Sequence, residues 1–347
     1  MDENEIGKAI AFLRKRCRYT QKDLADRIGI SDKAVSKWER GIGLPDIGYL
    51  RKLAILLDTD TDSLLAGDVV HHDNGWHGVL ILDNNQYGIG AGTTIYDKPL
   101  VNYLLCYFLL VGIKEIVIVC SEKDRVFIDS ELGDGSKLGM KLYIYSGNLR
   151  NILEITNWDK GNIMMVYGRC LLYGVDQTRF FQKAMVDKEH FTMLVLPKKY
   201  RNHEEHVYMD KDKKVISSDS NAYLRTQYDF CDIPILFFPI EIIKDICESD
   251  GIREFISKYS VEREVYVQVL DRGFVEIEID SWENVQEAST FIKIVQDRCG
   301  MNVYCIEEVA WRRGFINIEQ LRRLGELHNN MECGKYITDL CDRIQNK

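Results

Sequence analysis

Three glycines follow the first strongly apolar segment in the larger part of this chain. Val79–Leu82 is typical of a buried strand, and Gly88, Gly90 and Gly92 come soon after it. Backbone N–H groups of a glycine-rich turn can form a nest that binds a phosphate or another anion. The same cluster is also typical of a flexible turn, so the sequence leaves both interpretations open.

Cysteine and histidine, which are common metal ligands, show no ligand spacing in this sequence. The chain has ten cysteines without a C-x-x-C pair, and its seven histidines form no metal-binding pattern. We therefore expect no metal site, no cofactor and no disulfide framework. Most cysteines are expected to be reduced residues of the core.

The charge of the chain is distributed unevenly. From Ile6 to Arg40 there are ten Lys or Arg residues and four acidic residues, whereas the complete 347-residue chain has a net charge of −9. This contrast indicates a polyanion-binding head on an acidic body. A content of 46% apolar and 29% charged residues excludes a disordered or fibrous protein.

Short helices separated by turn signals are predicted for residues 5–66. Thr20 and Ser31 are good N-caps, and Gly29 permits a tight turn between two helices. The predicted helices are one through Ile6, Ile10 and Leu13, then Gln21–Ile28, Asp32–Arg40, Ile47–Leu57 and one around Asp62–Leu65. Together they predict a five-helix bundle.

Residues Thr20–Gly41 resemble the helix-turn-helix of Cro/repressor-type regulators. The resemblance rests on the cap Thr20, the small Ala25 where two helices cross, the turn at Gly29 and the segment Val35-Ser36-Lys37-Trp38-Glu39. It implies double-stranded DNA as a partner, with the Asp32–Arg40 helix in the major groove. The alternative is a helical module that binds another protein.

Candidate DNA contacts lie on the side of the Asp32–Arg40 helix that is expected to face solvent. The residues expected at base edges are Asp32, Lys33, Ser36 and Lys37. Arg40 is expected at a phosphate, and Gln21 at a phosphate or against a neighbouring side chain. Because one small module neutralises few phosphates, we expect a homo-oligomer, a dimer or a tetramer, on paired half-sites.

From residue 76 onward, apolar runs alternate with helical stretches, which is typical of an α/β domain. The predicted strands are Val79–Leu82, Glu115–Val119, Ile163–Val166, Met193–Leu196 and Ile233–Phe238. We predict a DNA-binding domain at 1–67, a linker at 68–75, an α/β domain at 76–294 and a helical C-terminal extension at 295–347.

Residues 76–347 resemble sugar-nucleotide pyrophosphorylases, and most closely the glucose-1-phosphate thymidylyltransferase family. The stretches that carry the resemblance are Ile95–Tyr103, Val111–Val119, Leu132–Gly139, Val166–Gly174, Asp271–Phe274 and Asn302–Asn317. The resemblance implies a doubly wound nucleotidyltransferase-like α/β domain that binds nucleotides and continues into a helical C-terminal extension.

Three departures from the family pattern lead us to expect a pseudo-enzyme. The Arg and the Lys of the family's glycine-rich loop have no counterpart between Asp83 and Thr94. The family's metal-binding Gly-Asp-Asn stands here as Gly168-Arg169-Cys170, and a guanidinium cannot bind Mg²⁺. The second metal carboxylate aligns with Glu278 or Asp280. Phosphoryl transfer depends on charge neutralisation by such groups.

Two further interpretations stay open for the body. Arg169 can pair with the phosphate of a bound nucleotide, or it can form an ion pair with a nearby acidic residue. Cys305, Glu308 and Arg312 match the family's regulatory nucleotide pocket, which implies that the body senses a ligand. The alternative explanation for these three residues is structural packing.

We expect a sequence-specific transcriptional regulator whose body senses a nucleotide or nucleotide sugar as effector. The alternative is an active sugar-1-phosphate nucleotidyltransferase with an attached DNA-binding domain, and a third possibility is a body that serves as a scaffold only. No targeting segment opens the sequence, and the apolar stretch Tyr103–Ile113 is too short to span a membrane. We therefore expect a cytoplasmic protein without a membrane partner.

Overall fold

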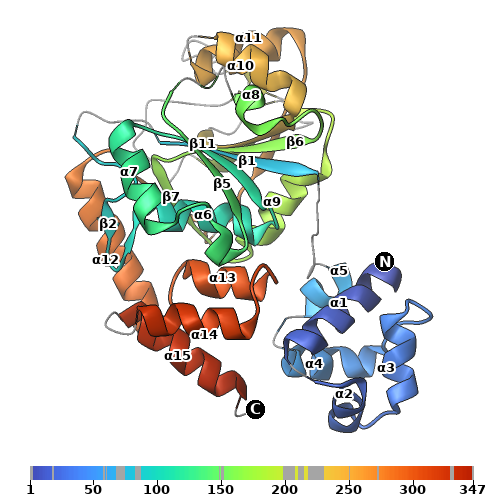
Figure 1. The fold of residues 1–347 in the computed structure, drawn as a ribbon. Helices are drawn as coiled ribbons and strands as arrows, with labels where there is room; N and C mark the ends of the chain where they lie inside the picture. Colours follow the sequence, from blue (N-terminus) through green and yellow to red (C-terminus); the bar gives the residue numbers. More distant parts are fainter. Residues whose placement is uncertain are drawn as a thin grey trace. The chain divides into compact units, whose positions relative to one another are not determined.

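Five short helices form the N-terminal head in the computed structural model of the chain (Figure 1). They are α1 (Glu3–Arg16), α2 (Gln21–Ile28), α3 (Asp32–Glu39), α4 (Ile47–Leu56) and α5 (Thr61–Ala66). The predicted five-helix bundle is confirmed, and the predicted ends of the last four helices agree with the structure to within one residue. Capping and turn residues explain this agreement because they act locally.

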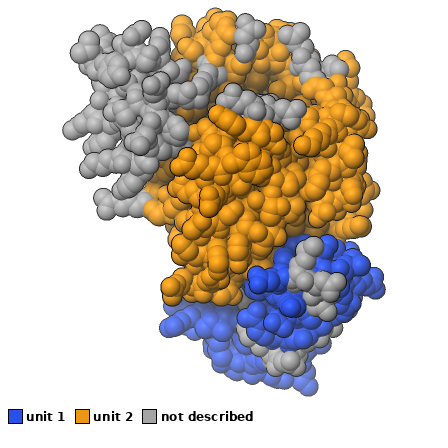
Figure 2. Space-filling model, turned by 90° about the vertical axis from the view of Figure 1, so that its left-hand side faces the viewer, with its two compact units in different colours: residues 1–72, 307–347 blue, residues 73–306 orange. Residues whose placement is uncertain are grey.

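The structure describes residues 3–17, 19–57, 59, 61–67, 75–82, 87–147, 149, 152–197, 208–209, 215–217, 230–249, 251–271, 273–328 and 332–345. The chain divides into two compact units, residues 1–72 with 307–347 and residues 73–306, which Figure 2 shows in different colours. The predicted linker at 68–75 lies outside the described residues except for Gly75.

The turn between α2 and α3 is built from local hydrogen bonds. The Thr20 hydroxyl accepts from the backbone N–H of Asp23, whose carboxylate accepts in return from the Thr20 N–H. Ser31 caps α3 in the same way through the N–H of Ala34. Between the two helices Gly29 has φ +90°, which glycine adopts without steric strain.

A buried ion pair connects α1 with α3 in the head. The Arg14 guanidinium donates from Nε and Nη2 to the two carboxylate oxygens of Glu39, at 2.5 and 3.1 Å. The side chains of the pair are only 10% and 7% exposed. Arg14 also donates from Nη1 to the Tyr19 carbonyl at 2.6 Å. The pair therefore ties the first helix to the end of α3 and to the chain that leads into α2.

A seven-stranded mixed sheet forms the centre of the body, with the strand order β12-β8-β11-β6-β1-β4-β5. Its strands are β1 (Trp76–Ile81), β4 (Glu115–Val119), β5 (Lys141–Tyr145), β6 (Asn162–Tyr167), β8 (Phe191–Pro197), β11 (Phe230–Pro239) and β12 (Val265–Val269). All five predicted strands are present, and the α/β fold is confirmed. Strand β11 runs antiparallel to both neighbours, which the apolar runs did not indicate.

The longest apolar stretch of the chain lies in a buried helix. In α6 (Leu100–Leu110) all residues but the last are buried, so this helix is covered on every side by the body. Among the described residues there is no helix whose length and apolarity would let it span a bilayer.

The remaining helices and the small ribbons complete the two units (Figure 1). The helices are α7 (Glu122–Glu131), α8 (Ile152–Thr156), α9 (Gln177–Val186), α10 (Ile243–Glu248), α11 (Ile252–Glu262), α12 (Trp282–Cys299), α13 (Ile306–Arg312), α14 (Ile318–Leu327) and α15 (Glu332–Gln345). The ribbons pair β2 (Thr94–Ile95) with β3 (Lys98–Pro99), β7 (Cys170–Tyr173) with β13 (Val275–Glu278), and β9 (Tyr208–Met209) with β10 (Val215–Ser217).

Replacing Glu39 by Ala is expected to destabilise the head by about 3–5 kcal/mol, because Arg14 would be left buried without its counter-charge. Hydrogen exchange of the α3 amides measures this change. The matched control is Glu5→Ala, since Glu5 pairs with Lys8 on the same helix but both side chains are about half exposed or more, at 48% and 68%. That control should cost less than about 1 kcal/mol. Equal losses in both variants would contradict the role of the buried pair.

Candidate functional site

The outer side of α3 presents the predicted DNA-contacting residues. Val35 and Trp38 are buried in the core of the head, at 0% and 8% exposure. The residues that the structure leaves exposed on the same helix and at its end are Asp32, Lys33, Lys37 and Arg40, with Ser36 half-buried. The helix therefore has the amphipathic form that a major-groove helix needs, with a polar, largely basic face available to DNA.

Two of these side chains also bond to the backbone of α3 itself. The Asp32 carboxylate accepts from the backbone N–H of Lys33 at 2.8 Å, and the Arg40 Nε donates to the Ser36 carbonyl at 3.2 Å. These contacts hold both side chains close to the ends of the helix. Asp32 is acidic, so its place at the outer face favours contact with a base amino group over contact with a phosphate.

Gln21 belongs to the network that holds the recognition helix. Its Nε2 donates to the Glu39 carboxylate at 2.7 Å, beside the bonds from Arg14. Of the two roles expected for Gln21, the structure thus shows the contact with a neighbouring side chain. The sequence analysis did not single out Glu39 or Arg14 for this role, because their positions are 25 residues apart and only the tertiary fold joins them.

The ends of three parallel strands meet at one edge of the sheet in the body. The backbone N–H of Leu82, just after β1, donates to the Val119 carbonyl at the end of β4. The N–H of Gly168, just after β6, donates to the Ile81 carbonyl at the end of β1. The glycine-rich segment and the Gly168-Arg169-Cys170 turn therefore leave the sheet at the same edge, where ligands bind in open α/β sheets.

The glycine-rich segment uses some of its own N–H groups within the protein. The Ala91 N–H donates to the Asp124 carboxylate at 2.7 Å, and the Gly90 N–H donates to the Thr93 hydroxyl at 3.0 Å. Asp124 is only 6% exposed and also accepts from the Ser121 hydroxyl at 2.8 Å. These two N–H groups are therefore occupied, which favours the turn over the anion nest at Gly90.

Each glycine of this segment has a different environment. A Cβ at position 90 would lie 2.3 Å from the Asp124 carboxylate, so the close approach of Asp124 requires Gly90. A Cβ at position 92 would lie 3.0 Å from the Phe127 ring, whereas Gly88 has φ +69° and open space around it. Residues 83–86 of the same loop, including Asp83, lie outside the described residues.

A small ribbon brings the candidate metal carboxylates beside Arg169. Strands β7 and β13 pair antiparallel with Cys170 opposite Glu278, and the Ile279 N–H donates to the Arg169 carbonyl at 2.5 Å. Ile277 and Ile279 are buried, so by strand alternation Glu278 and Asp280 share the other face. Asp280 accepts from the Asn284 amide at 2.7 Å, and Arg169 is exposed.

The cysteine nearest to the glycine-rich segment is not an active nucleophile. Burial, with a smaller contribution from the Asp124 charge, raises the pKa of the Cys120 thiol to about 12. Cys120 therefore remains a thiol at neutral pH, as expected of a reduced core residue. Cys299 differs from this expectation because it is exposed at the end of α12.

Glu308 and Arg312 lie one helical turn apart in α13 and bond to each other. The Arg312 Nε donates to Glu308 Oε1 at 2.8 Å, and the Tyr336 hydroxyl of α15 donates to Glu308 Oε2 at 2.7 Å. Glu308 is 7% exposed. These contacts favour the structural role of the two residues, because the Glu308 carboxylate is used to tie α13 to α15.

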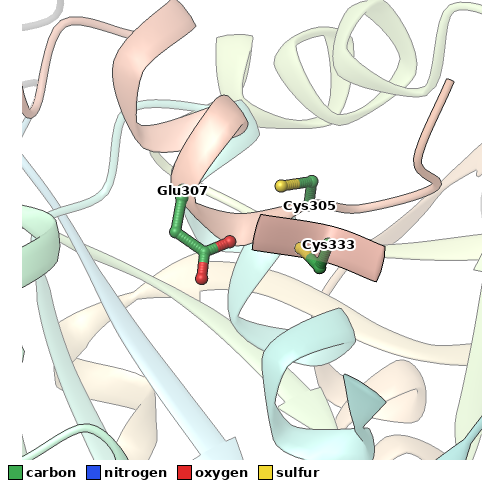
Figure 3. Close-up of side chains that lie close together, drawn as sticks. All are labelled: Cys305, Glu307 and Cys333. Atoms are coloured by element: carbon green, nitrogen blue, oxygen red, sulfur yellow. The ribbon is translucent and has the colours of Figure 1, made fainter. Parts of the chain in front are cut away.

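Three potential metal ligands lie close together near the start of α13, as Figure 3 shows. They are Cys305, Glu307 and Cys333, whose ligand atoms all lie within 4.8 Å of one another. Cys305 was predicted as a ligand-binding residue, but the sequence gave no indication of this group. Cys333 is distant in sequence, and the three residues match no spacing pattern of a metal site.

Comparisons with known proteins identify both parts of the chain. Residues 10–64 match the family model described as helix-turn-helix, and residues 93–222 match the one described as nucleotidyl transferase. The chain therefore joins a helix-turn-helix module to a nucleotidyltransferase domain, as the sequence resemblance implied.

The relatives of the body are named as enzymes. A glucose-1-phosphate thymidylyltransferase of Neisseria meningitidis is 24% identical over 262 residues, which cover 71% of this chain and 90% of the relative. One of Mycolicibacterium smegmatis is 27% identical over 266 residues, covering 72% and 90%. A solved structure titled a putative glucose-1-phosphate thymidylyltransferase from Bacillus anthracis has a TM-score of 0.52 at 11% identity, covering 62% of this chain and 94% of its own, and shows the shared fold.

These relatives contradict the expectation of a pseudo-enzyme. That expectation rested on the missing loop Arg and Lys and on Arg169 in place of a metal-binding Asp. The relatives align over about 70% of the chain and are named for a transfer activity. Substitutions at three positions are thus too narrow a basis for inactivity, because the surrounding strands and loops can present other charged groups to a substrate.

Replacing Asp124 by Ala is expected to destabilise the body by about 1–3 kcal/mol, because the Ala91 N–H and the Ser121 hydroxyl would lose a buried acceptor. A urea titration should show this as a lower midpoint with an unchanged slope. The control is Asp129→Ala on the same helix, whose side chain is 54% exposed. A midpoint that falls as far in the control as in Asp124→Ala would refute this assignment.

Proposed function

We propose that the chain is a DNA-binding sugar-1-phosphate nucleotidyltransferase that acts as a transcriptional regulator in the cytoplasm. The observation that carries this proposal is the presence of both matched regions on one chain, a helix-turn-helix at 10–64 and a nucleotidyl transferase region at 93–222. The domain boundaries proposed for these functions are 1–67 for the head, 68–75 for a linker, 76–294 for the α/β domain and 295–347 for its helical extension.

The head is proposed to bind double-stranded DNA in a sequence-specific way. Its support is the exposed polar face of α3, which the buried network of Arg14, Gln21 and Glu39 holds rigidly against the rest of the head. A helix presented in this way can enter the major groove, where side chains near its N-terminus reach base edges. We propose Asp32, Lys33, Ser36 and Lys37 for these contacts and Arg40 for a phosphate. Binding as a homo-oligomer would place two heads on paired half-sites.

The body is proposed to transfer a nucleotidyl group to a sugar phosphate, as the names of its relatives state for those proteins. Glu278 and Asp280 offer carboxylate oxygens on one face of the strand end, and such hard oxygen donors fit Mg²⁺. A bound Mg²⁺ would supply charge neutralisation of the phosphates. Arg169, on the paired strand, is placed to contact a phosphate oxygen directly, since a guanidinium matches phosphate geometry.

Regulation would follow if a ligand of the body changed DNA binding by the head. A nucleotide or nucleotide sugar is the candidate effector, because it is the substrate or product of the proposed reaction. Such coupling requires that the ligand bind more tightly to one state of the oligomer than to another. A DNA-binding assay with and without the nucleotide sugar therefore tests this part of the proposal separately from catalysis.

The double variant Ser36→Ala/Lys37→Ala is expected to lose sequence discrimination in DNA binding. A selection from random duplexes with the parent protein identifies the preferred sequence, and a titration then compares preferred with scrambled DNA. Each lost base contact should reduce discrimination by about 1–3 kcal/mol. The control Lys8→Ala carries its change on the exposed surface of α1 and should keep the preference. If the double variant discriminates as well as the parent, α3 does not read the groove.

Pyrophosphate release is expected when the protein is mixed with glucose 1-phosphate, a nucleoside triphosphate and Mg²⁺. Glu278→Gln combined with Asp280→Asn should lower the rate roughly 100-fold, because the phosphate charge would lose its stabilising partners. Glu283→Gln, an exposed change in the first turn of α12, is the control and should keep the parent rate. No release above background with any of the four deoxynucleoside triphosphates would refute the transferase proposal.

A further inference from the structure

Two thiols and one carboxylate gather among the C-terminal helices. The Sγ atoms of Cys305 and Cys333 and a carboxylate oxygen of Glu307 all lie within 4.8 Å of one another (Figure 3). Cys305 directly precedes α13, Glu307 lies in the first turn of α13, and Cys333 lies in the first turn of α15. The local geometry of one helix start thus sets two of the ligands, and the approach of α15 sets the third.

The approach of α15 to α13 is fixed by contacts next to the three side chains. The Tyr336 hydroxyl, one helical turn after Cys333, donates to the Glu308 carboxylate at 2.7 Å. Glu308 in turn accepts from Arg312 at 2.8 Å. The neighbouring Glu308 is therefore committed to this network, whereas the Glu307 carboxylate lies toward the two thiols. The structure selects Glu307 over Glu308 as the oxygen donor.

We propose that Cys305, Glu307 and Cys333 bind a zinc ion or a similar soft divalent metal, with water as the fourth ligand. Zinc accepts thiolate at about 2.3 Å and carboxylate at about 2.0–2.2 Å in tetrahedral geometry, which places ligand atoms about 3.5–3.8 Å apart. The observed separations of 4.8 Å or less require only a small contraction to reach this arrangement. The two thiol protons pass to solvent when the metal binds.

The donor set separates this site from the proposed transferase site. Thiolates are soft ligands that favour zinc, whereas Mg²⁺ takes oxygen donors such as Glu278 and Asp280. A disulfide between Cys305 and Cys333 is the competing chemistry. It needs sulfur atoms about 2.05 Å apart, a larger contraction, and it gives no role to Glu307. The inference does not rest on the proposed function, because it concerns only the three side chains.

The test uses the purified full chain, stripped with a chelator under reducing conditions, loaded with zinc and desalted before metal analysis. We expect about one zinc ion per parent chain, and cobalt substitution should give the thiolate-to-cobalt charge-transfer band of a tetrahedral sulfur site. Cys333→Ser should abolish both signals, and Glu307→Gln should weaken metal affinity about 10- to 100-fold.

Matched variants separate this site from other binding. Cys341→Ser changes another cysteine of α15, and Cys299→Ser changes an exposed cysteine, so both should keep the zinc and the cobalt band. Circular dichroism of Cys333→Ser checks that the variant folds, and the cobalt spectrum of the parent gives an answer even if it does not. Absence of the charge-transfer band in the parent, retention of zinc by Cys333→Ser, or a Cys305–Cys333 disulfide that forms in preference to metal binding would each overturn the proposal.

Discussion

Parallel pairing of β1 with β4 on one side and β6 on the other is the constraint on which the body depends. All three strands end at one edge of the sheet, where the Leu82 N–H bonds to Val119 and the Gly168 N–H bonds to Ile81. The approach is so close that a Cβ at position 168 would lie 2.4 Å from the Leu82 side chain. The loop after β1 and the turn after β6 must therefore share one site, whatever substrate it takes.

Buried polar groups decide which residues remain available for ligands. Asp124 takes an N–H of the glycine-rich segment, Glu39 takes Gln21 and Arg14, and Glu308 takes Arg312 and Tyr336. A buried carboxylate needs such partners, so these groups stabilise the fold before they can serve a ligand. The exposed groups on α3 and on the β7–β13 ribbon are left for recognition, which explains why the proposed contacts concentrate there.

The correction concerning catalysis follows from the same distinction. Single positions, such as Arg169 in place of a metal-binding acid, describe one interaction with a substrate. Similarity that extends over 262 residues describes the whole arrangement of strands and loops that holds the substrate. Electrostatic stabilisation comes from many oriented groups, so a changed residue alters the division of labour without removing the site. Glu278 and Asp280, carried beside Arg169 by β13, illustrate such a division.

The sequence by itself determined the elements of this protein that depend on local chemistry. The caps at Thr20 and Ser31, the turn at Gly29 and the apolar runs of the strands gave the head and the α/β body, because capping and periodicity act between near neighbours. Only the tertiary structure decided the antiparallel direction of β11, the ion pair of Arg14 with Glu39 and the approach of Cys333 to Cys305 and Glu307. These contacts join residues that are distant along the chain, and no local pattern records which distant partner a buried charge or thiol will meet.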